Sequence, residues 1–197
     1  MNDNRKKLLI ILLISVLIFS LFTLYISSET PFSVSARSAA LYVPETDSFL
    51  YLKNPDEKRG MASTTKIMTA LIALEQIRED ELITVGDESC GIDGSSLYLK
   101  SGQTLSAIDL IYALMLQSAN DAASALAYHI SGGIEEFALL MNTKAEELGM
   151  TNTHFKNPHG LDDKEHFTTA RDLAILSANA LKNSRLREIS STQKREI

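Results

Sequence analysis

The sequence predicts an α+β fold in which an N-terminal β-hairpin is followed by a block of helices. Two short apolar runs, Ala39–Val43 and Phe49–Leu52, flank the turn-forming residues Pro44–Asp47, and this arrangement is typical of a hairpin. From Ser63 onward, apolar residues recur at helical spacing through most of the chain. With 197 residues, the chain is long enough for one domain with a hydrophobic core.

Five helices are predicted after the hairpin and the polar loop Asn54–Gly60. They are expected from Ser63, over Thr104–Met115, from Asp121, over Ile134–Leu148, and from Thr169 to about Asn183. Apolar residues lie on most sides of the first helix, which predicts that it is buried. Gly132–Gly133 and Gly149 punctuate the later helices, and Thr169 with Asp172 has capping-box spacing. The remaining segments are predicted to be irregular: Thr84–Gly102 with a short strand, Gln117–Asn120, Thr151–Phe167, and a polar tail ending at Ile197.

Residues 1–28 are predicted to be a signal peptide or an N-terminal membrane anchor. Arg5–Lys7 precede an apolar run of 19 residues, Leu8–Ile26, which is long for a signal core and just sufficient to cross a bilayer. A buried core helix is the alternative, but the run shows no polar face and the basic residues lie only upstream. We therefore expect the rest of the chain to be extracytoplasmic, either secreted or anchored at the cell envelope.

Composition argues against two classes of function. The net charge is −6 and no long run of Lys or Arg occurs, so a nucleic-acid partner is not expected. The single cysteine, Cys90, has no partner for an internal disulfide or for a cysteine-based zinc site.

Ser63 and Lys66 form an S-x-x-K motif, the pattern of a nucleophilic serine with a lysine base. On a helical turn, residues i and i+3 share one face, and a buried lysine loses its charge readily enough to accept a proton. Ser191 and Lys194 form a second match, but they lie in the polar tail. Since this pattern arises by chance about once in a chain of ordinary composition and this length, a structural role for Ser63 stays open on local pattern alone.

Ser118 and Asn120 form an S-x-N motif in the predicted break between two helices, where both side chains can project into a cleft. Helix capping is the alternative role, because both residue types favour it. A second match, Ser177 with Asn179, lies inside a predicted helix, where the two side chains point in different directions.

Together the motifs resemble the low-molecular-mass D-alanyl-D-alanine carboxypeptidases, the S11 group of serine peptidases among penicillin-binding proteins. The resemblance covers residues 36–192. It is carried by Met61–Ala70, Gly94–Leu99, Leu116–Ala123, Phe137–Gly149, Thr153–Phe155, Asn157–Asp162 and Thr169–Leu173.

This resemblance implies a penicillin-binding protein/β-lactamase-like transpeptidase fold and a set of catalytic roles. Ser63 would attack the carbonyl between the last two D-alanines of a peptidoglycan stem peptide, and Lys66 would accept its proton. Ser118 would relay that proton to the departing D-alanine, while Asn120 would orient the lysine and the substrate amide. β-Lactams would acylate the same serine, and no metal or organic cofactor is implied.

One family motif, Lys-Thr-Gly, is not found after residue 120. Lys100–Gly102 has similar letters but precedes the second motif, and we interpret it as a loop. No strands clearly follow the helices, although a hairpin alone is marginally stable. We therefore expect residues 29–197 to be a C-terminally incomplete catalytic domain that lacks its later sheet strands. Because one lost oxyanion donor costs about 10²–10³ in rate, poor activity is expected.

Three alternative functions remain open. A class A β-lactamase shares the fold and the first motif, but the Ser-Ala-Asn motif fits the carboxypeptidases better. A catalytically impaired binding or regulatory protein would retain the fold without turnover. A zinc D,D-peptidase would use His154, His159, His166 and Asp162, although three loop histidines without regular spacing are more often solvated or capping.

Overall fold

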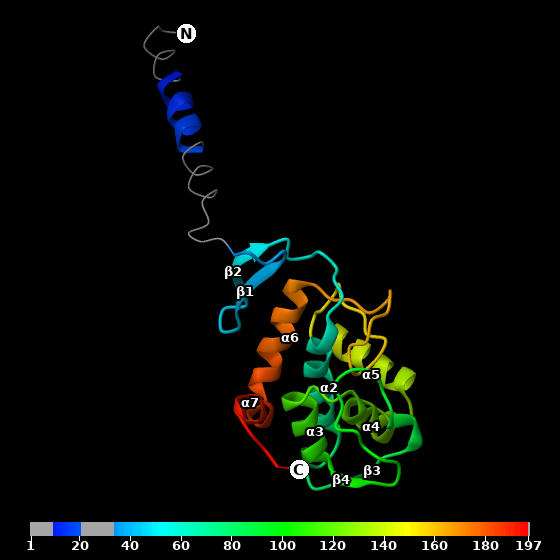
Figure 1. Ribbon diagram of the computed structural model, residues 1–197. Helices are drawn as coiled ribbons and strands as arrows, with labels where there is room; N and C mark the ends of the chain where they lie inside the picture. Colours follow the sequence, from blue (N-terminus) through cyan, green and yellow to red (C-terminus); the bar gives the residue numbers. More distant parts are fainter. Residues whose placement is uncertain (1–9, 21–33, 197) are drawn as a thin grey trace. The chain divides into compact units, whose positions relative to one another are not determined.

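The structure, a computed structural model, describes residues 10–20 and 34–196 (Figure 1). The chain divides into two units, Met1–Ala36 and Arg37–Ile197. In the first unit, residues 10–20 are helical. Among the described residues, no helix combines the length and the apolar character needed to cross a bilayer. The rest of the apolar run, residues 8–9 and 21–26, lies outside the described residues, so the signal or anchor assignment stays a prediction.

The predicted hairpin is confirmed. Strands β1 (Ala39–Val43) and β2 (Ser48–Lys53) pair antiparallel, with Ala39 opposite Lys53 and a β-bulge between Leu41 and Tyr42. Helix α6 (Ala170–Lys182) packs against β1 and so joins the hairpin to the helical block (Figure 1).

A second small sheet corrects the predicted start of one helix. Strand β3 (Leu82–Thr84) pairs antiparallel with β4 (Thr104–Ser106), whereas Thr104 was predicted to begin a helix. Helix α3 begins at Ala107 instead and extends to Leu116, because the Ser106 hydroxyl accepts a hydrogen bond from the Asp109 N–H and caps the helix. The apolar periodicity could not separate a short edge strand from the helix that follows it.

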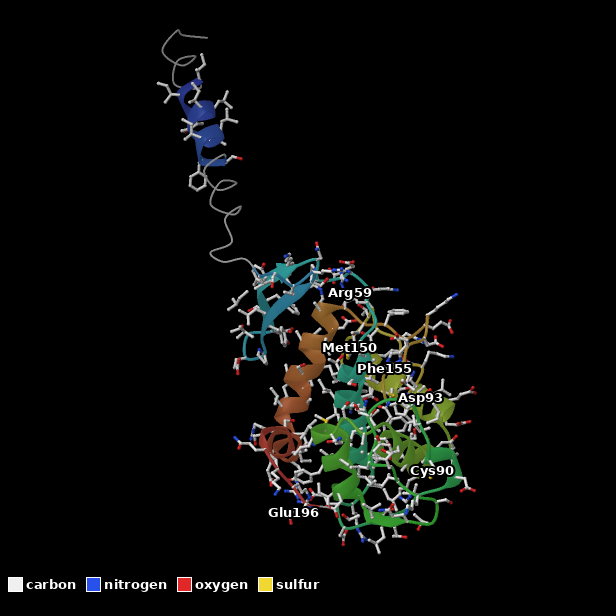
Figure 2. The ribbon with its side chains drawn as sticks, viewed as in Figure 1. Arg59, Cys90, Asp93, Met150, Phe155 and Glu196 are labelled. Atoms are coloured by element: carbon white, nitrogen blue, oxygen red, sulfur yellow. The ribbon has the colours of Figure 1, made fainter. Side chains whose placement is uncertain are left out.

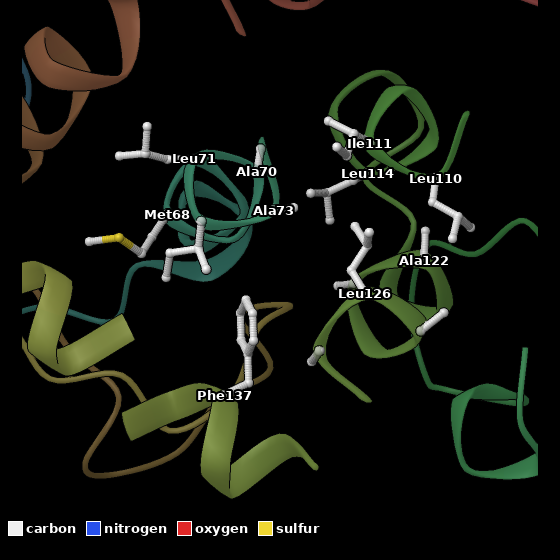
Figure 3. Packing of buried hydrophobic residues seen from close by; sticks show 14 of the residues in the cluster. Met68, Ala70, Leu71, Ala73, Leu110, Ile111, Leu114, Ala122, Leu126 and Phe137 are labelled. Carbon is white, nitrogen blue, oxygen red and sulfur yellow. The ribbon is translucent and has the colours of Figure 1, made fainter. Parts of the chain in front are cut away.

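Helix α2 (Lys66–Gln76) is the centre of the fold, as its apolar residues on most sides predicted. It contacts α3, α6, α4 (Asn120–Ser131) and α5 (Ile134–Glu147). Figure 3 shows the core between these helices, which includes Met68, Leu71, Leu114, Leu126 and Phe137. Alanines on α4 are fully buried and let its backbone approach α3 closely.

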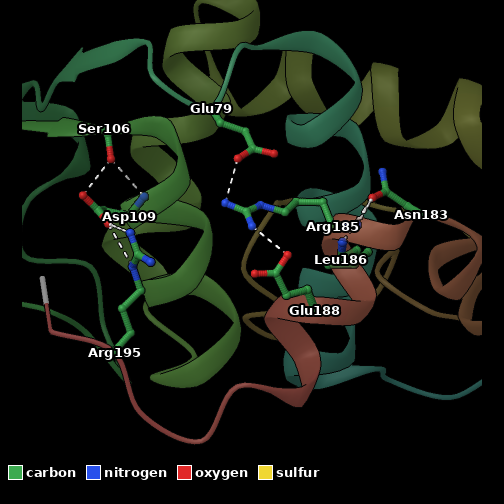
Figure 4. A network of polar contacts seen from close by, with 8 residues as sticks. All are labelled: Glu79, Ser106, Asp109, Asn183, Arg185, Leu186, Glu188 and Arg195. Atoms are coloured by element: carbon green, nitrogen blue, oxygen red, sulfur yellow. Dashed lines mark hydrogen bonds and ion pairs between the residues drawn. The ribbon is translucent and has the colours of Figure 1, made fainter.

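The predicted polar tail contains a further helix, α7 (Ser184–Ser191), which corrects the sequence prediction. Its two buried apolar residues, Leu186 and Ile189, pack into the core although the rest of the segment is polar. The Asn183 side chain caps the helix by accepting hydrogen bonds from two backbone N–H groups. An ion pair of Arg185 with Glu79 joins α7 to the segment that follows α2, and Arg185 also pairs with Glu188 within α7 (Figure 4).

Candidate active site

Ser63 lies in a single 3₁₀ turn, η1 (Ala62–Thr65), immediately before α2. Its side chain is exposed. Two threonine hydroxyls fix the turn: Thr64 Oγ1 donates to the Met61 carbonyl, and Thr65 Oγ1 donates to the Ala62 carbonyl at 2.7 Å. The predicted nucleophile is therefore presented at the start of the buried helix, on a turn held by local hydrogen bonds.

Lys66 is the first residue of α2 and is only 2% exposed. Its Nζ lies 3.3 Å from Ser63 Oγ and 2.6 Å from the carbonyl oxygen of His159. Burial disfavours the charged ammonium and lowers the pKa of Lys66 from 10.5 to about 8. The structure thus brings a hydroxyl and a partly deprotonated amine together, as the spacing of the motif predicted.

Ser63, Lys66 and Ser118 share one open groove of about 350 Å³. Its other lining residues are Thr64, Ile67, Leu114 and Met115. Ser118 lies between α3 and α4 with φ +57°, a left-handed conformation that few residues other than glycine adopt. This backbone strain in the groove wall is of the kind that clusters at functional sites.

Asn120, the fourth predicted residue, is buried beside the groove but does not line it. Its amide donates to the carbonyl of Asp93, which is labelled in Figure 2. Gly94 has φ +91°, and a Cβ there would lie 2.8 Å from the Asn120 amide nitrogen, so a side chain at this position would be strained and would displace the amide. The capping alternative is wrong for both motif residues, because the N-cap of α4 is Ala119 and no side chain caps it.

Asp121 is a buried residue beside this motif that the sequence reasoning missed. Its carboxylate accepts hydrogen bonds from the Ser96 hydroxyl and from the backbone N–H groups of Leu97, Leu99 and Ala122. It thereby fastens residues 96–99 to the start of α4. An acid in the first turn of a helix, where the helix dipole favours negative charge, is the only local signal that could have indicated it.

The loop that contains Asn157–Leu161 packs against the back of the nucleophile turn. Its carbonyls accept hydrogen bonds from Lys66 Nζ and, at Pro158, from Thr69 Oγ1. Gly160 has φ +91°, and a Cβ there would overlap the Ala62 carbonyl oxygen. The loop therefore depends on glycine for its close approach to the turn that carries Ser63.

The histidines considered for a zinc site each have their own hydrogen-bond partners. His159 Nδ1 accepts from the Leu161 N–H, His154 Nδ1 bonds to the Glu165 carbonyl, and both ring nitrogens of His166 have protein partners. Within residues 10–20 and 34–196, no group of three or more His, Cys, Asp or Glu side chains could hold a metal ion.

The competing sequence matches lack this geometry. Ser191 is exposed and bonds within α7, while Lys194 pairs with Glu196 in solvent. Ser177 and Asn179 bond to carbonyls within α6. Lys100–Gly102 lies in a turn, as interpreted from the sequence.

Comparison with known proteins gives a consistent match. A family model described as D-alanyl-D-alanine carboxypeptidase matches residues 25–197. The carboxypeptidase DacF of Bacillus subtilis is 36% identical over 162 residues, which cover 80% of this chain and 42% of that protein. DacC of Escherichia coli is 40% identical over 159 residues, which cover 75% of this chain and 40% of that protein.

Solved structures agree with the predicted fold. The crystal structure of penicillin-binding protein 6B from Escherichia coli matches with a TM-score of 0.81 at 32% identity, over 86% of this chain and 57% of that one. The α+β fold prediction is therefore confirmed. The chain spans about two fifths of the length of the curated relatives that it matches.

Proposed function

The chain belongs to the D-alanyl-D-alanine carboxypeptidase family, the S11 peptidases among the low-molecular-mass penicillin-binding proteins, and from this premise we propose its reaction. It removes the terminal D-alanine from peptidoglycan stem peptides through an acyl-enzyme on Ser63. The observation that carries the proposal is the 3.3 Å separation between Ser63 Oγ and the buried Nζ of Lys66.

Acylation follows from this pair. In the neutral form of Lys66, Nζ has a lone pair and accepts the Ser63 proton while Oγ forms a bond to the substrate carbonyl carbon. The C–N bond to the last D-alanine then breaks, and its nitrogen takes up the proton from Lys66. Water subsequently adds to the acyl carbonyl and returns a proton to Ser63 Oγ, which releases the shortened peptide.

Ser118 and Asn120 support this reaction in the proposal. Ser118 shares the groove with Ser63 and Lys66, so its hydroxyl is suited to relay the proton to the leaving amine. Asn120 is anchored beside the groove through Asp93, and we assign it the orientation of Lys66 and of the substrate amide. β-Lactams are proposed as acylating inhibitors at the same serine.

We further propose that residues 1–28 are a signal peptide or membrane anchor and that residues 29–197 act at the cell envelope on peptidoglycan. Support comes from the basic start and the apolar run Leu8–Ile26. Fusion of residues 1–36 to a reporter that is active only outside the cytoplasm should give activity. An inactive fusion protein would contradict the proposal.

The carboxypeptidase reaction is tested by D-alanine release from diacetyl-Lys-D-Ala-D-Ala. We expect release that depends on Ser63. Ser63→Ala should abolish the release, whereas Ser191→Ala, at the exposed second motif, should leave it unchanged. Equal release by the chain and by Ser63→Ala would contradict the proposal. Rapid penicillin turnover in place of a long-lived adduct would favour a β-lactamase.

A further inference from the structure

The turn that presents Ser63 has an unfavourable backbone. Ala62, the preceding residue, has φ +44°, in the left-handed region that residues with a side chain rarely adopt. Its carbonyl accepts a hydrogen bond from Thr65 Oγ1 at 2.7 Å. The orientation of Ser63 therefore depends on contacts that hold Ala62 in this conformation.

Thr65 is itself fully buried and has a second partner, His166. Thr65 Oγ1 lies 2.7 Å from His166 Nε2, across 101 residues of sequence. The hydroxyl has one proton, and the hydrogen bond to Ala62 uses it. Toward His166, Thr65 must therefore accept a hydrogen bond, which requires a proton on Nε2.

The hydrogen bond at the other ring nitrogen, Nδ1, requires the same tautomer of His166. His166 Nδ1 lies 3.0 Å from the backbone N–H of Lys156 and accepts its hydrogen bond. His166 is 3% exposed, and its ring packs against that of Phe155 in a T-shaped arrangement with 5.9 Å between the ring centroids. Only the neutral Nε2–H tautomer satisfies both contacts.

We propose that His166 is a positioning residue for the Ser63 nucleophile, acting through Thr65 and the Ala62 carbonyl to hold the turn η1 in its reactive orientation. The inference rests on the proposed function of Ser63. A chain of three hydrogen bonds, from Lys156 through His166 and Thr65 to Ala62, joins the 151–167 loop to the nucleophile turn. His166 itself does not line the groove.

Protonation would break this chain, because an imidazolium has no acceptor for the Lys156 N–H. Burial lowers the pKa of His166, and nearby His154 also lowers it, while the carboxylates of Asp163 and Asp162 raise it. A charge on His166 would in turn lower the pKa of His159. The neutral tautomer is thus maintained at neutral pH, and Ser63 reactivity should be lost when the ring is protonated in acid.

The kinetic test compares variants by their rate of labelling with fluorescent penicillin. His166→Ala should lower the rate constant at saturating penicillin by at least about tenfold, because misplaced reacting groups are costly, with little change in the half-saturating concentration. His166→Gln, whose amide can donate to Thr65, should recover most of the rate. His154→Ala is the matched control, since its ring bonds to the Glu165 carbonyl and not to η1. Melting curves confirm that each variant is folded.

Thr65→Val provides a second variant that removes the same link if His166→Ala does not fold. Unchanged rates in His166→Ala or Thr65→Val would overturn the proposal, as would a loss confined to the half-saturating concentration. Absence of labelling in the unaltered chain would instead overturn the proposed function together with the positioning role.

A structural measurement separates the hydrogen-bond chain from catalysis. ¹⁵N NMR of the Ser63→Ala chain, which cannot be acylated at this position, should show His166 as the neutral Nε2–H tautomer at pH 7. A Nδ1–H tautomer or an imidazolium would overturn the inferred chain of hydrogen bonds.

Discussion

Lys66 is buried against neutral partners, a serine hydroxyl and a peptide carbonyl. Burial therefore lowers its pKa to about 8, which leaves about a tenth of the molecules with a free amine at pH 7. A lysine of this kind can act as a base near neutral pH.

This pKa predicts the pH dependence of acylation. The rate of Ser63 labelling by penicillin should rise about tenfold per pH unit below pH 8 and level off above it, because only the neutral amine accepts a proton. Penicillin labelling stopped at fixed times between pH 6 and pH 10 measures this profile. Lys66→Arg, which keeps the charge but cannot deprotonate, should show no such rise. A flat profile in the unaltered chain would contradict the assignment of Lys66 as the base.

At this scale, the sequence predicted Ser63 and Lys66 because their contact is local, three residues apart on one turn. It could not predict the roles of Gly160 or His166, which reach the nucleophile turn only through the tertiary fold. It placed Asn120 in the cleft, whereas the fold turns the Asn120 side chain toward Asp93.

Among the elements, helix α6 begins with a cap that its local sequence predicted only in part. Thr169 caps it by accepting a hydrogen bond from the Asp172 N–H, as the capping-box spacing predicted. The Asp172 carboxylate does not complete the box, however. It accepts from the Asn152 N–H and the Thr153 hydroxyl and so joins the helix to the 151–167 loop.

Removal of this cap should destabilise the fold. Thr169→Ala should lower the free energy of unfolding by about 1 kcal/mol, because it leaves a helix N–H without its acceptor. Ser177→Ala lies on the same helix and removes only a hydroxyl that bonds to the Leu173 carbonyl, so it should have little effect. Urea denaturation of both variants measures the difference, and equal stabilities would contradict the capping role.

Elements with strong periodicity or clear turn and stop signals were predicted, whereas β3, β4 and α7 were not. Gly149 ends α5 in a left-handed conformation close to the predicted boundary. Strand β3 and helix α7 were missed because each has too few apolar residues to give a periodic pattern.

The unit Arg37–Ile197 is organised around α2, which is buried by five neighbouring helices and carries Lys66 at its first position. The hairpin followed by helices was predictable because each part has its own sequence period. The arrangement of the helices was not, since it depends on contacts such as those of Arg185 with Glu79 across the fold.

Buried histidines should make the molecule sensitive to acid. Burial, together with the charges of Lys66 and His166, lowers the pKa of His159 from 6.5 to about 4. A lowered histidine pKa means that the unfolded chain binds more protons, so stability is present above pH 6.5 and is lost as the pH falls toward 4. The loss attributable to His159 is at most about 3 kcal/mol.

This acid sensitivity is measured by urea denaturation at pH 7 and pH 4. The His159→Gln variant should lose less stability between these pH values than the unaltered chain. The same loss in both proteins would show that other groups govern the acid response.

We propose Ser63 as the nucleophile and Lys66 as its base. Peptide mapping by mass spectrometry after treatment with benzylpenicillin tests it most directly. We expect a single long-lived adduct on Ser63 that is absent from the Lys66→Arg variant. An adduct on Ser118 or Ser191, or labelling of Ser63 that is unaffected by loss of the lysine amine, would contradict it.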